Sequence, residues 1–92
     1  NPEHLYFACS KEDSEEYLEH GLYPGDRNMV HLSSTRLNAL EAGRHIIGKP
    51  IVLLVDVKAA EEGGNEIMKA GTTVYLSKEI SGKYLKQLPD ST

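Results

Sequence analysis

A run of seven residues, Ile51 to Val57, constrains the fold more than any other part of the chain. It reads IVLLVDV and consists of β-branched residues and leucine apart from one aspartate. An uninterrupted apolar run of this length is typical of a strand in the middle of a sheet that is covered on both faces. Its uncharged part is far too short to span a bilayer. A sheet built around this strand is therefore expected.

Other segments have the composition of strands. We expect them at residues 4–9, 29–32, 66–69 and 73–77, with the last two forming a hairpin. In the second of these, the two-residue period of a strand places Val30 and Leu32 on one face. Met29 and His31 then lie on the opposite face, and His31 and Ser33 are expected to face a surface that a ligand could line.

Helices are expected between these strands. Ser10 is a typical N-cap, and Gly21 is a natural stop for the helix that follows it. Ser33 or Ser34 caps a second helix, which we expect over residues 35–47. A single turn at residues 58–62 and a closing helix at residues 80–88 complete the pattern. The order is that of an α+β domain with a mixed, mostly antiparallel sheet and short flanking helices.

The bulk composition is that of one small globular domain. The 92 residues are 39% hydrophobic and 26% charged, which leaves no room for a second core. A net charge of −4 argues against a free-standing nucleic-acid binder, although a local pair of arginines can still engage RNA. Much of the acid is expected on the solvated face of the first helix, at Glu12, Asp13, Glu15, Glu16 and Glu19.

The single cysteine, Cys9, cannot form an internal disulfide, which favours a reducing compartment. No basic and apolar signal segment opens the sequence, so a cytoplasmic location without a membrane partner is expected. As a catalytic nucleophile Cys9 would need a nearby base, and none is evident in the sequence. A small buried strand residue is the simpler interpretation. The four histidines lack the spacing of a metal site, so we expect no metal.

One group of residues has the chemistry of a ligand site. Arg27 precedes the strand at residues 29–32, and His31 follows four residues later. A guanidinium that binds phosphate and an imidazole that forms hydrogen bonds suit a dinucleotide cleft. An exposed arginine and a half-buried structural histidine explain the residues equally well.

Several ordered motifs resemble one known family. The segment 21–33 (GLYPGDRNMVHLS) is similar to a G-L…R-x-H-V-H-L-S pattern, and residues 39–56 resemble A-x-x-x-G-x-R-x-G-x-P-V-V-L-x-I-D. Residues 73–77 (TVYLS) and 83–85 (KYL) match two later elements, so the likeness runs from about Leu5 to Leu88. The family is that of the NAD-dependent RNA 2'-phosphotransferases, and the chain resembles their carboxy-terminal, ADP-ribosyltransferase-like lobe.

That resemblance implies a reaction and a set of site residues. Such enzymes transfer an internal RNA 2'-phosphate, such as that left in tRNA at a splice junction, to the ADP-ribose of NAD and release nicotinamide. Arg27 matches an essential arginine that clamps a phosphate or the NAD pyrophosphate. Residues expected to contact NAD are Ala8, Cys9, His31, Leu32, Ser33 and Val74. Val74 stands where many ADP-ribosyltransferases have a catalytic glutamate, which this branch does not need.

The sequence also departs from the family pattern. Phe7 replaces the histidine of L-Y-H-G-T, and Met29 replaces the first histidine of H-V-H. The family's amino-terminal winged-helix lobe, which grips RNA, has no counterpart in these residues. We therefore expect residues 1–92 to form a single lobe, with the winged helix missing or supplied separately.

Three interpretations follow. The chain is an NAD-dependent 2'-phosphotransferase lobe, cytoplasmic or, in a eukaryote, nuclear. Alternatively it is an eroded binding module of the same fold that recognises NAD, ADP-ribose or a protein. A plain α+β domain with a coincidental likeness is the third.

Overall fold

The structure is a computed structural model that describes residues 2–24, 29–44 and 49–88. Its centre is a six-stranded sheet in the order β4-β5-β2-β1-β3-β6. The strands are β1 (His4–Cys9), β2 (Val30–Ser33), β3 (Ile51–Asp56), β4 (Ile67–Lys69), β5 (Val74–Ser77) and β6 (Leu85–Gln87). All strand pairings in the described chain are antiparallel. The expected α+β fold with a largely antiparallel sheet is confirmed.

The apolar run forms an internal strand, as expected. β3 lies between β1 and β6, and it pairs with β1 over six positions, from His4 opposite Asp56 to Cys9 opposite Ile51. Leu53 and Val55 are fully buried. The strand ends at Asp56 rather than Val57, because the Asp56 carboxylate accepts a hydrogen bond from the backbone N–H of Ala59 at 3.1 Å and caps the next helix.

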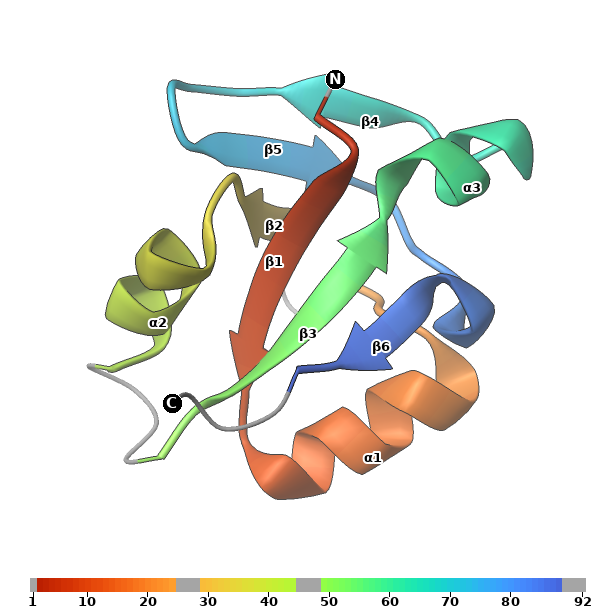
Figure 1. Cartoon of the computed structure of the whole chain (residues 1–92). Coiled ribbons are helices and arrows are strands. Elements are labelled where there is room, and N and C mark those ends of the chain that lie inside the picture. The colour runs from red at the N-terminus through yellow and green to blue at the C-terminus, as the bar shows by residue number, and fades with distance from the viewer. Residues whose placement is uncertain (1, 25–28, 45–48, 89–92) are drawn as a thin grey trace.

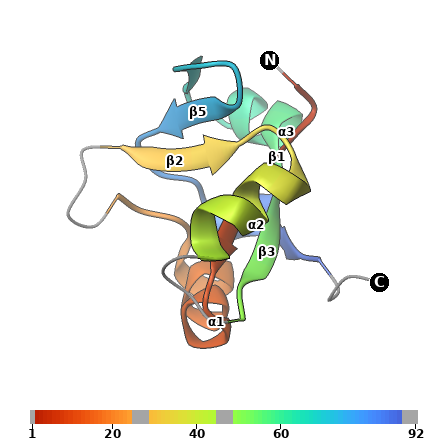
Figure 2. The same ribbon diagram turned by 90° about the vertical axis from the view of Figure 1, so that its left-hand side faces the viewer.

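Three short helices flank the sheet: α1 (Lys11–His20), α2 (Arg36–Arg44) and α3 (Val57–Glu62). In Figure 2, α2 lies in front of β1 and β3, while α1 lies below them. The expected cap of α1 is confirmed, because the Ser10 hydroxyl accepts the Asp13 N–H at 3.1 Å. Gly21 ends the helix with a φ of 94°.

Two expectations about helices were wrong. Thr35, not Ser33 or Ser34, caps α2, since its hydroxyl accepts the Asn38 N–H at 3.1 Å. Ser33 is still in β2, opposite Val74, and Ser34, which follows the strand, donates its N–H to the Thr73 carbonyl at 2.9 Å.

The expected closing helix at residues 80–88 is instead a 3₁₀ turn, η1 (Gly82–Tyr84), followed by β6. Leu85 pairs with Val55, and the Leu88 N–H donates to the Val52 carbonyl at 2.9 Å. These bonds join segments about thirty residues apart in sequence, so the local pattern of apolar residues could not predict them.

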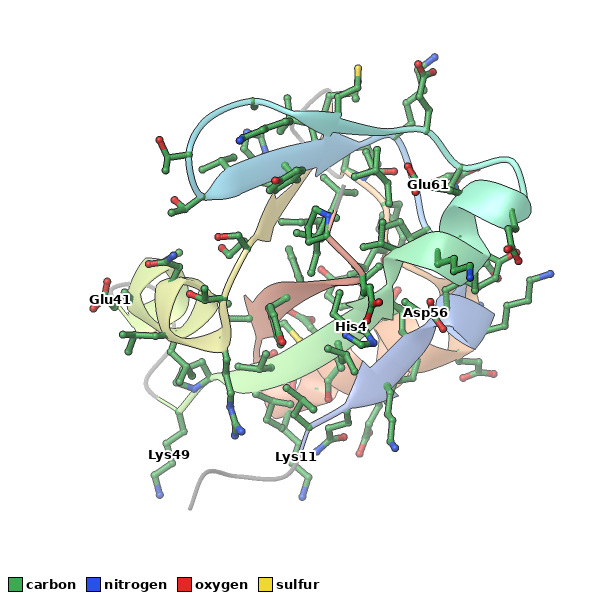
Figure 3. All side chains as sticks on the ribbon, turned by 45° about the horizontal axis from the view of Figure 1, so that its top comes forward. His4, Lys11, Glu41, Lys49, Asp56 and Glu61 are labelled. Atoms are coloured by element: carbon green, nitrogen blue, oxygen red, sulfur yellow. The ribbon has the colours of Figure 1, made fainter. Side chains whose placement is uncertain are left out.

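Charged residues cover the outside. The five acids of α1 are all exposed, which confirms the expected solvated face. Lys11, Glu41 and Lys49 are likewise exposed, and Figure 3 shows Glu41 and Lys49 at the periphery of the molecule. Within the described residues, none of the helices has the length and apolar character needed to cross a bilayer.

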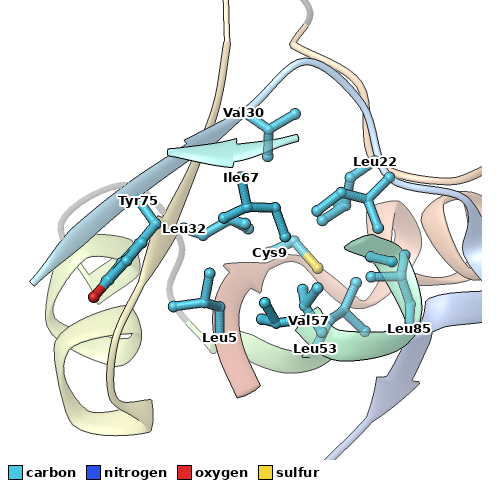
Figure 4. Packing of buried hydrophobic residues seen from close by; sticks show 13 residues of the cluster. Leu5, Cys9, Leu22, Val30, Leu32, Leu53, Val57, Ile67, Tyr75 and Leu85 are labelled. Atoms are coloured by element: carbon cyan, nitrogen blue, oxygen red, sulfur yellow. The ribbon is translucent and has the colours of Figure 1, made fainter. Parts of the chain in front are cut away.

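A single hydrophobic core joins the layers. The cluster includes Leu5 and Cys9 of β1, Leu32 of β2 and Leu53 of β3 (Figure 4). Val55 of β3 also belongs to it. All are at most 3% exposed. The core holds β1, β2 and β3 together and so fixes the backbone around the site described next.

Candidate ligand groove

A groove opens between β1 and β2. These neighbouring strands share one register pair in the described chain, Tyr6 opposite Ser33, in contrast to the six pairs that join β1 to β3. Figure 2 shows β2 crossing β1 at a steep angle. Residues of both strands line the resulting groove of about 470 Å³, a volume in the usual range for a small-molecule site.

Small side chains of α2 form one wall. Ala39, Ala42 and Gly43 line the groove and lie three and four residues apart, on one face of the helix. Ala39 is buried, whereas Ala42 is exposed at the rim. Because none of these side chains is larger than a methyl group, the helix approaches β1 and β2 without filling the space between them.

Three aromatic rings form another part of the lining. Phe7 of β1 packs edge to face on Tyr17 of α1, with ring centroids 5.7 Å apart and an interplanar angle of 82°. Tyr17 packs in the same way on Tyr23, at 5.7 Å and 73°. Such pairs gain about 0.5–1.5 kcal/mol beyond simple burial. Flat apolar surfaces of this kind can receive a planar ring of a ligand.

His31 supplies a polar group to the groove. Its Nδ1 lies 3.1 Å from the backbone carbonyl oxygen of Met29. A carbonyl only accepts hydrogen bonds, so Nδ1 carries the hydrogen and donates it. In the neutral ring, Nε2 is then a hydrogen-bond acceptor. As expected from the strand period, Val30 and Leu32 are buried and His31 is exposed.

Most of the residues expected to bind a cofactor meet in this groove. Ala8, His31, Leu32, Ser33 and Val74 all line it. The strand register explains why, because Ser33 lies opposite both Tyr6 of β1 and Val74 of β5. The structure thus brings these residues together, while their contacts with a cofactor stay a prediction.

Cys9 does not line the groove, and Arg27 is not among the residues that the structure describes. The Cys9 side chain lies in the core, 3% exposed. Burial, with a smaller effect of Asp13, raises the pKa of its thiol to about 12, as fits the interpretation as a buried strand residue.

Sequence reasoning missed part of the lining. Neither Tyr17 nor Tyr23 is among the residues expected from the sequence to contact a ligand, yet both line the groove. The small residues of α2 are likewise absent from the site expected from the sequence. Their spacing at Ala39, Ala42 and Gly43 is the one signal that could have indicated a wall with open space beside it.

Comparisons with known proteins agree with these features. The family model for "RNA 2'-phosphotransferase, Tpt1 / KptA family" matches residues 1–79. A probable RNA 2'-phosphotransferase of Archaeoglobus fulgidus is 39% identical over 83 residues, which are 90% of this chain and 38% of that protein. The corresponding protein of Agrobacterium fabrum is 37% identical over 92 residues, 99% of this chain and 48% of that protein. The chain spans less than half the length of these relatives.

Fold and groove together define an α+β domain with a ligand-sized cleft between β1 and β2, where the two strands share a single register pair. The family match covers most of that domain, including every described residue of the groove lining. The chain belongs to the RNA 2'-phosphotransferase family.

Proposed function

We propose that the chain is the NAD-binding part of an RNA 2'-phosphotransferase, which transfers an internal RNA 2'-phosphate to the ADP-ribose of NAD and releases nicotinamide. The observation that carries this proposal is the meeting of Ala8, His31, Ser33 and Val74 in one groove of a family member. These residues come from three strands, β1, β2 and β5. They meet because the strands are neighbours in the sheet, although they are far apart in sequence.

The groove suits a dinucleotide in shape and chemistry. Its volume of about 470 Å³ accommodates a ligand of this size with parts left in solvent. Aromatic faces at Phe7, Tyr17 and Tyr23 suit a planar base or nicotinamide ring. The His31 ring and the Ser33 hydroxyl offer hydrogen bonds to ribose or phosphate oxygens.

Arg27 would supply the positive charge. Among the described residues that line the groove, none is lysine or arginine. A cationic partner stabilises the negative charge of a pyrophosphate, and arginine binds phosphate with two parallel hydrogen bonds. Pro24 and Met29, the described residues on either side of the segment that contains Arg27, both line the groove. We therefore assign the phosphate clamp to Arg27.

Catalysis in this arrangement depends on position and charge. A phosphate group is already anionic, so its attack requires no base, and the apolar Val74 is compatible with the reaction. The residues would hold the reacting groups in line and stabilise charge as the nicotinamide leaves.

A binding experiment and a turnover experiment test the proposal. NAD at one hundred times its Kd should stabilise the chain by about 2.7 kcal/mol, which raises the Tm of a domain of this size by about 10–20 °C. Release of 2'-phosphate from a 2'-phosphorylated RNA should be lost in Arg27→Ala. Lys49→Ala is the matched control, because Lys49 is exposed, carries the same charge and does not line the groove. Absence of a thermal shift with both NAD and ADP-ribose would contradict the proposal.

A binding module of the same fold is the second candidate. Phe7 and Met29 both line the groove, where the family resemblance leads one to expect histidines. Two apolar side chains at these positions favour a domain that binds its ligand without catalysing a reaction. Binding of NAD without turnover, in the wild-type chain supplied with a winged-helix lobe, would identify this alternative.

A further inference from the structure

Tyr23 is an exposed aromatic residue with a fixed backbone. Its side chain is 44% exposed, the second-highest value among the large hydrophobic residues that the structure describes. The preceding residue, Leu22, exchanges two backbone hydrogen bonds with Ile80, at 2.7 and 2.9 Å. Gly21 before it ends α1 and packs against the Ile80 backbone. The main chain therefore presents Tyr23 at a defined place beside the groove.

The ring of Tyr23 is held at two points. Its hydroxyl donates a hydrogen bond to Glu16 Oε1 at 2.7 Å, and its ring packs edge to face on Tyr17. The hydrogen bond to Glu16 is also the largest cause of the raised pKa of Tyr23. Ordering a solvent-exposed side chain costs conformational entropy. Tyr23 is not itself part of the core cluster, although the Tyr17 ring on which it packs lies against that cluster.

The same ring borders two cavities. On one side is the groove between β1 and β2. On the other is a second cavity of about 380 Å³, whose lining includes Asn65, Ser81 and Lys83. Tyr23 therefore lines both a groove rich in aromatic residues and a second cavity with more polar groups. A dinucleotide has the same alternation, with planar rings separated by a polar ribose and pyrophosphate.

From these contacts we infer that Tyr23 determines specificity by stacking on one planar nitrogen heterocycle of the ligand, and that Glu16 is its positioning residue. This inference rests on the proposed function, because it assigns to Tyr23 the recognition of one ring of the dinucleotide that the same groove is proposed to bind. Among the described aromatic pairs, Tyr23 contacts only Tyr17, so at least one of its faces is left uncovered by another ring. A base stacked on an aromatic face gains about as much as a good hydrogen bond.

Four variants separate the role of the ring from that of its anchor. Tyr23→Ala removes the ring, whereas Tyr23→Phe keeps the ring and removes the hydroxyl. Glu16→Ala removes the acceptor of the hydrogen bond. Glu15→Ala is the matched control, because it removes the same charge from an exposed neighbouring position of α1.

Three ligands identify the ring that is bound. Kd is measured by calorimetry for NAD, ADP-ribose and nicotinamide mononucleotide. If Tyr23 stacks on adenine, Tyr23→Ala weakens NAD and ADP-ribose by roughly 5- to 150-fold and leaves the mononucleotide unchanged. If it stacks on nicotinamide, NAD and the mononucleotide weaken and ADP-ribose does not. Unchanged Kd values for all three ligands would overturn the inference.

The role of Glu16 is tested by a double-mutant cycle. Tyr23→Phe and Glu16→Ala each remove the same hydrogen bond, so each should raise the affected Kd by about 2- to 5-fold and the double variant by no more. Additive effects, or a fall in Tm without a change in Kd, would show that Glu16 does not act through the tyrosine. If the wild-type chain binds none of the three ligands, the proposed function itself fails, a result distinct from wild-type binding that Tyr23→Ala leaves intact.

Discussion

Tyr6 of β1 lies opposite Ser33 of β2, and this is the one register pair that joins the two strands in the described chain. Both residues line the groove, which opens on the side where the strands diverge. A sheet that paired fully along β1 and β2 would close this space with backbone hydrogen bonds. The groove thus follows from how the strands are paired, and residues at its walls can be changed without breaking the sheet.

Filling the groove should weaken ligand binding and leave the fold intact. Ala42 of α2 is exposed at the rim, so Ala42→Phe places a ring over the groove without overpacking the core. We expect the Kd for NAD to rise at least tenfold, about 1.4 kcal/mol, with a change in Tm of only a few degrees. Leu37→Phe is the control, since Leu37 lies on the same helix, is 61% exposed and does not line the groove. An equal loss of affinity in both variants would contradict this prediction.

Gly21 should be far more sensitive to substitution than Gly64. Both have a positive φ, 94° and 100°, which L side chains rarely adopt. A Cβ at Gly21 would also lie 2.5 Å from the Ile80 carbonyl oxygen, whereas a Cβ at Gly64 meets nothing within 4 Å. Gly64→Ala should cost about 1 kcal/mol, and Gly21→Ala about 2–4 kcal/mol. Urea unfolding measures the free energy of unfolding of the two variants. Equal losses of stability would show that the close approach of Gly21 to the Ile80 carbonyl adds no cost to the substitution.

Interactions between residues that are neighbours in sequence were enough to predict much of the fold. The Ser10 cap, the Gly21 stop and the strand at His4–Cys9 all depend on neighbouring residues, and all are confirmed. The alternation of Val30 and Leu32 with His31 is confirmed for the same reason. These elements need no information from distant parts of the chain.

Tertiary pairing explains what the sequence did not reveal. β6 has three residues, two of them exposed, and it exists because Leu85 pairs with Val55. A propensity argument cannot detect such an edge strand, and it favours a helix there instead. The aromatic part of the groove has the same origin. Tyr17 and Tyr23 meet only because Gly21 turns the chain and the Leu22–Ile80 bridge fixes its return.

The neutral His31 ring should carry its hydrogen on Nδ1. The contact of 3.1 Å with the Met29 carbonyl requires a donor at that nitrogen. Long-range ¹H–¹⁵N correlation spectra above pH 8 should show a protonated Nδ1 for His31, with the spectrum of His4 as an internal comparison. Added NAD should shift the Nε2 resonance if this nitrogen forms a hydrogen bond to the ligand. A protonated Nε2 in the neutral ring would show that the Met29 contact does not form.

Cys9 should resist alkylation in the folded chain. Burial raises the pKa of its thiol from 9.0 to about 12, so at pH 8 the reactive thiolate is scarce. Iodoacetamide should label the native chain at least about a hundredfold more slowly than the chain in urea, as mass spectrometry can measure. Similar rates in the two states would mean that the side chain is accessible.

The same shift makes the stability depend on alkaline pH. A thiol with a raised pKa stabilises the folded state below its unfolded value of 9.0, because the folded chain then holds the proton more tightly. That contribution is lost as the pH rises from 9 towards 12. Between pH 9 and 12, the free energy of unfolding should therefore fall more steeply for the wild-type chain than for Cys9→Ala. Parallel curves would show that the thiol does not titrate with unfolding, and that groups common to both chains cause any alkaline loss of stability.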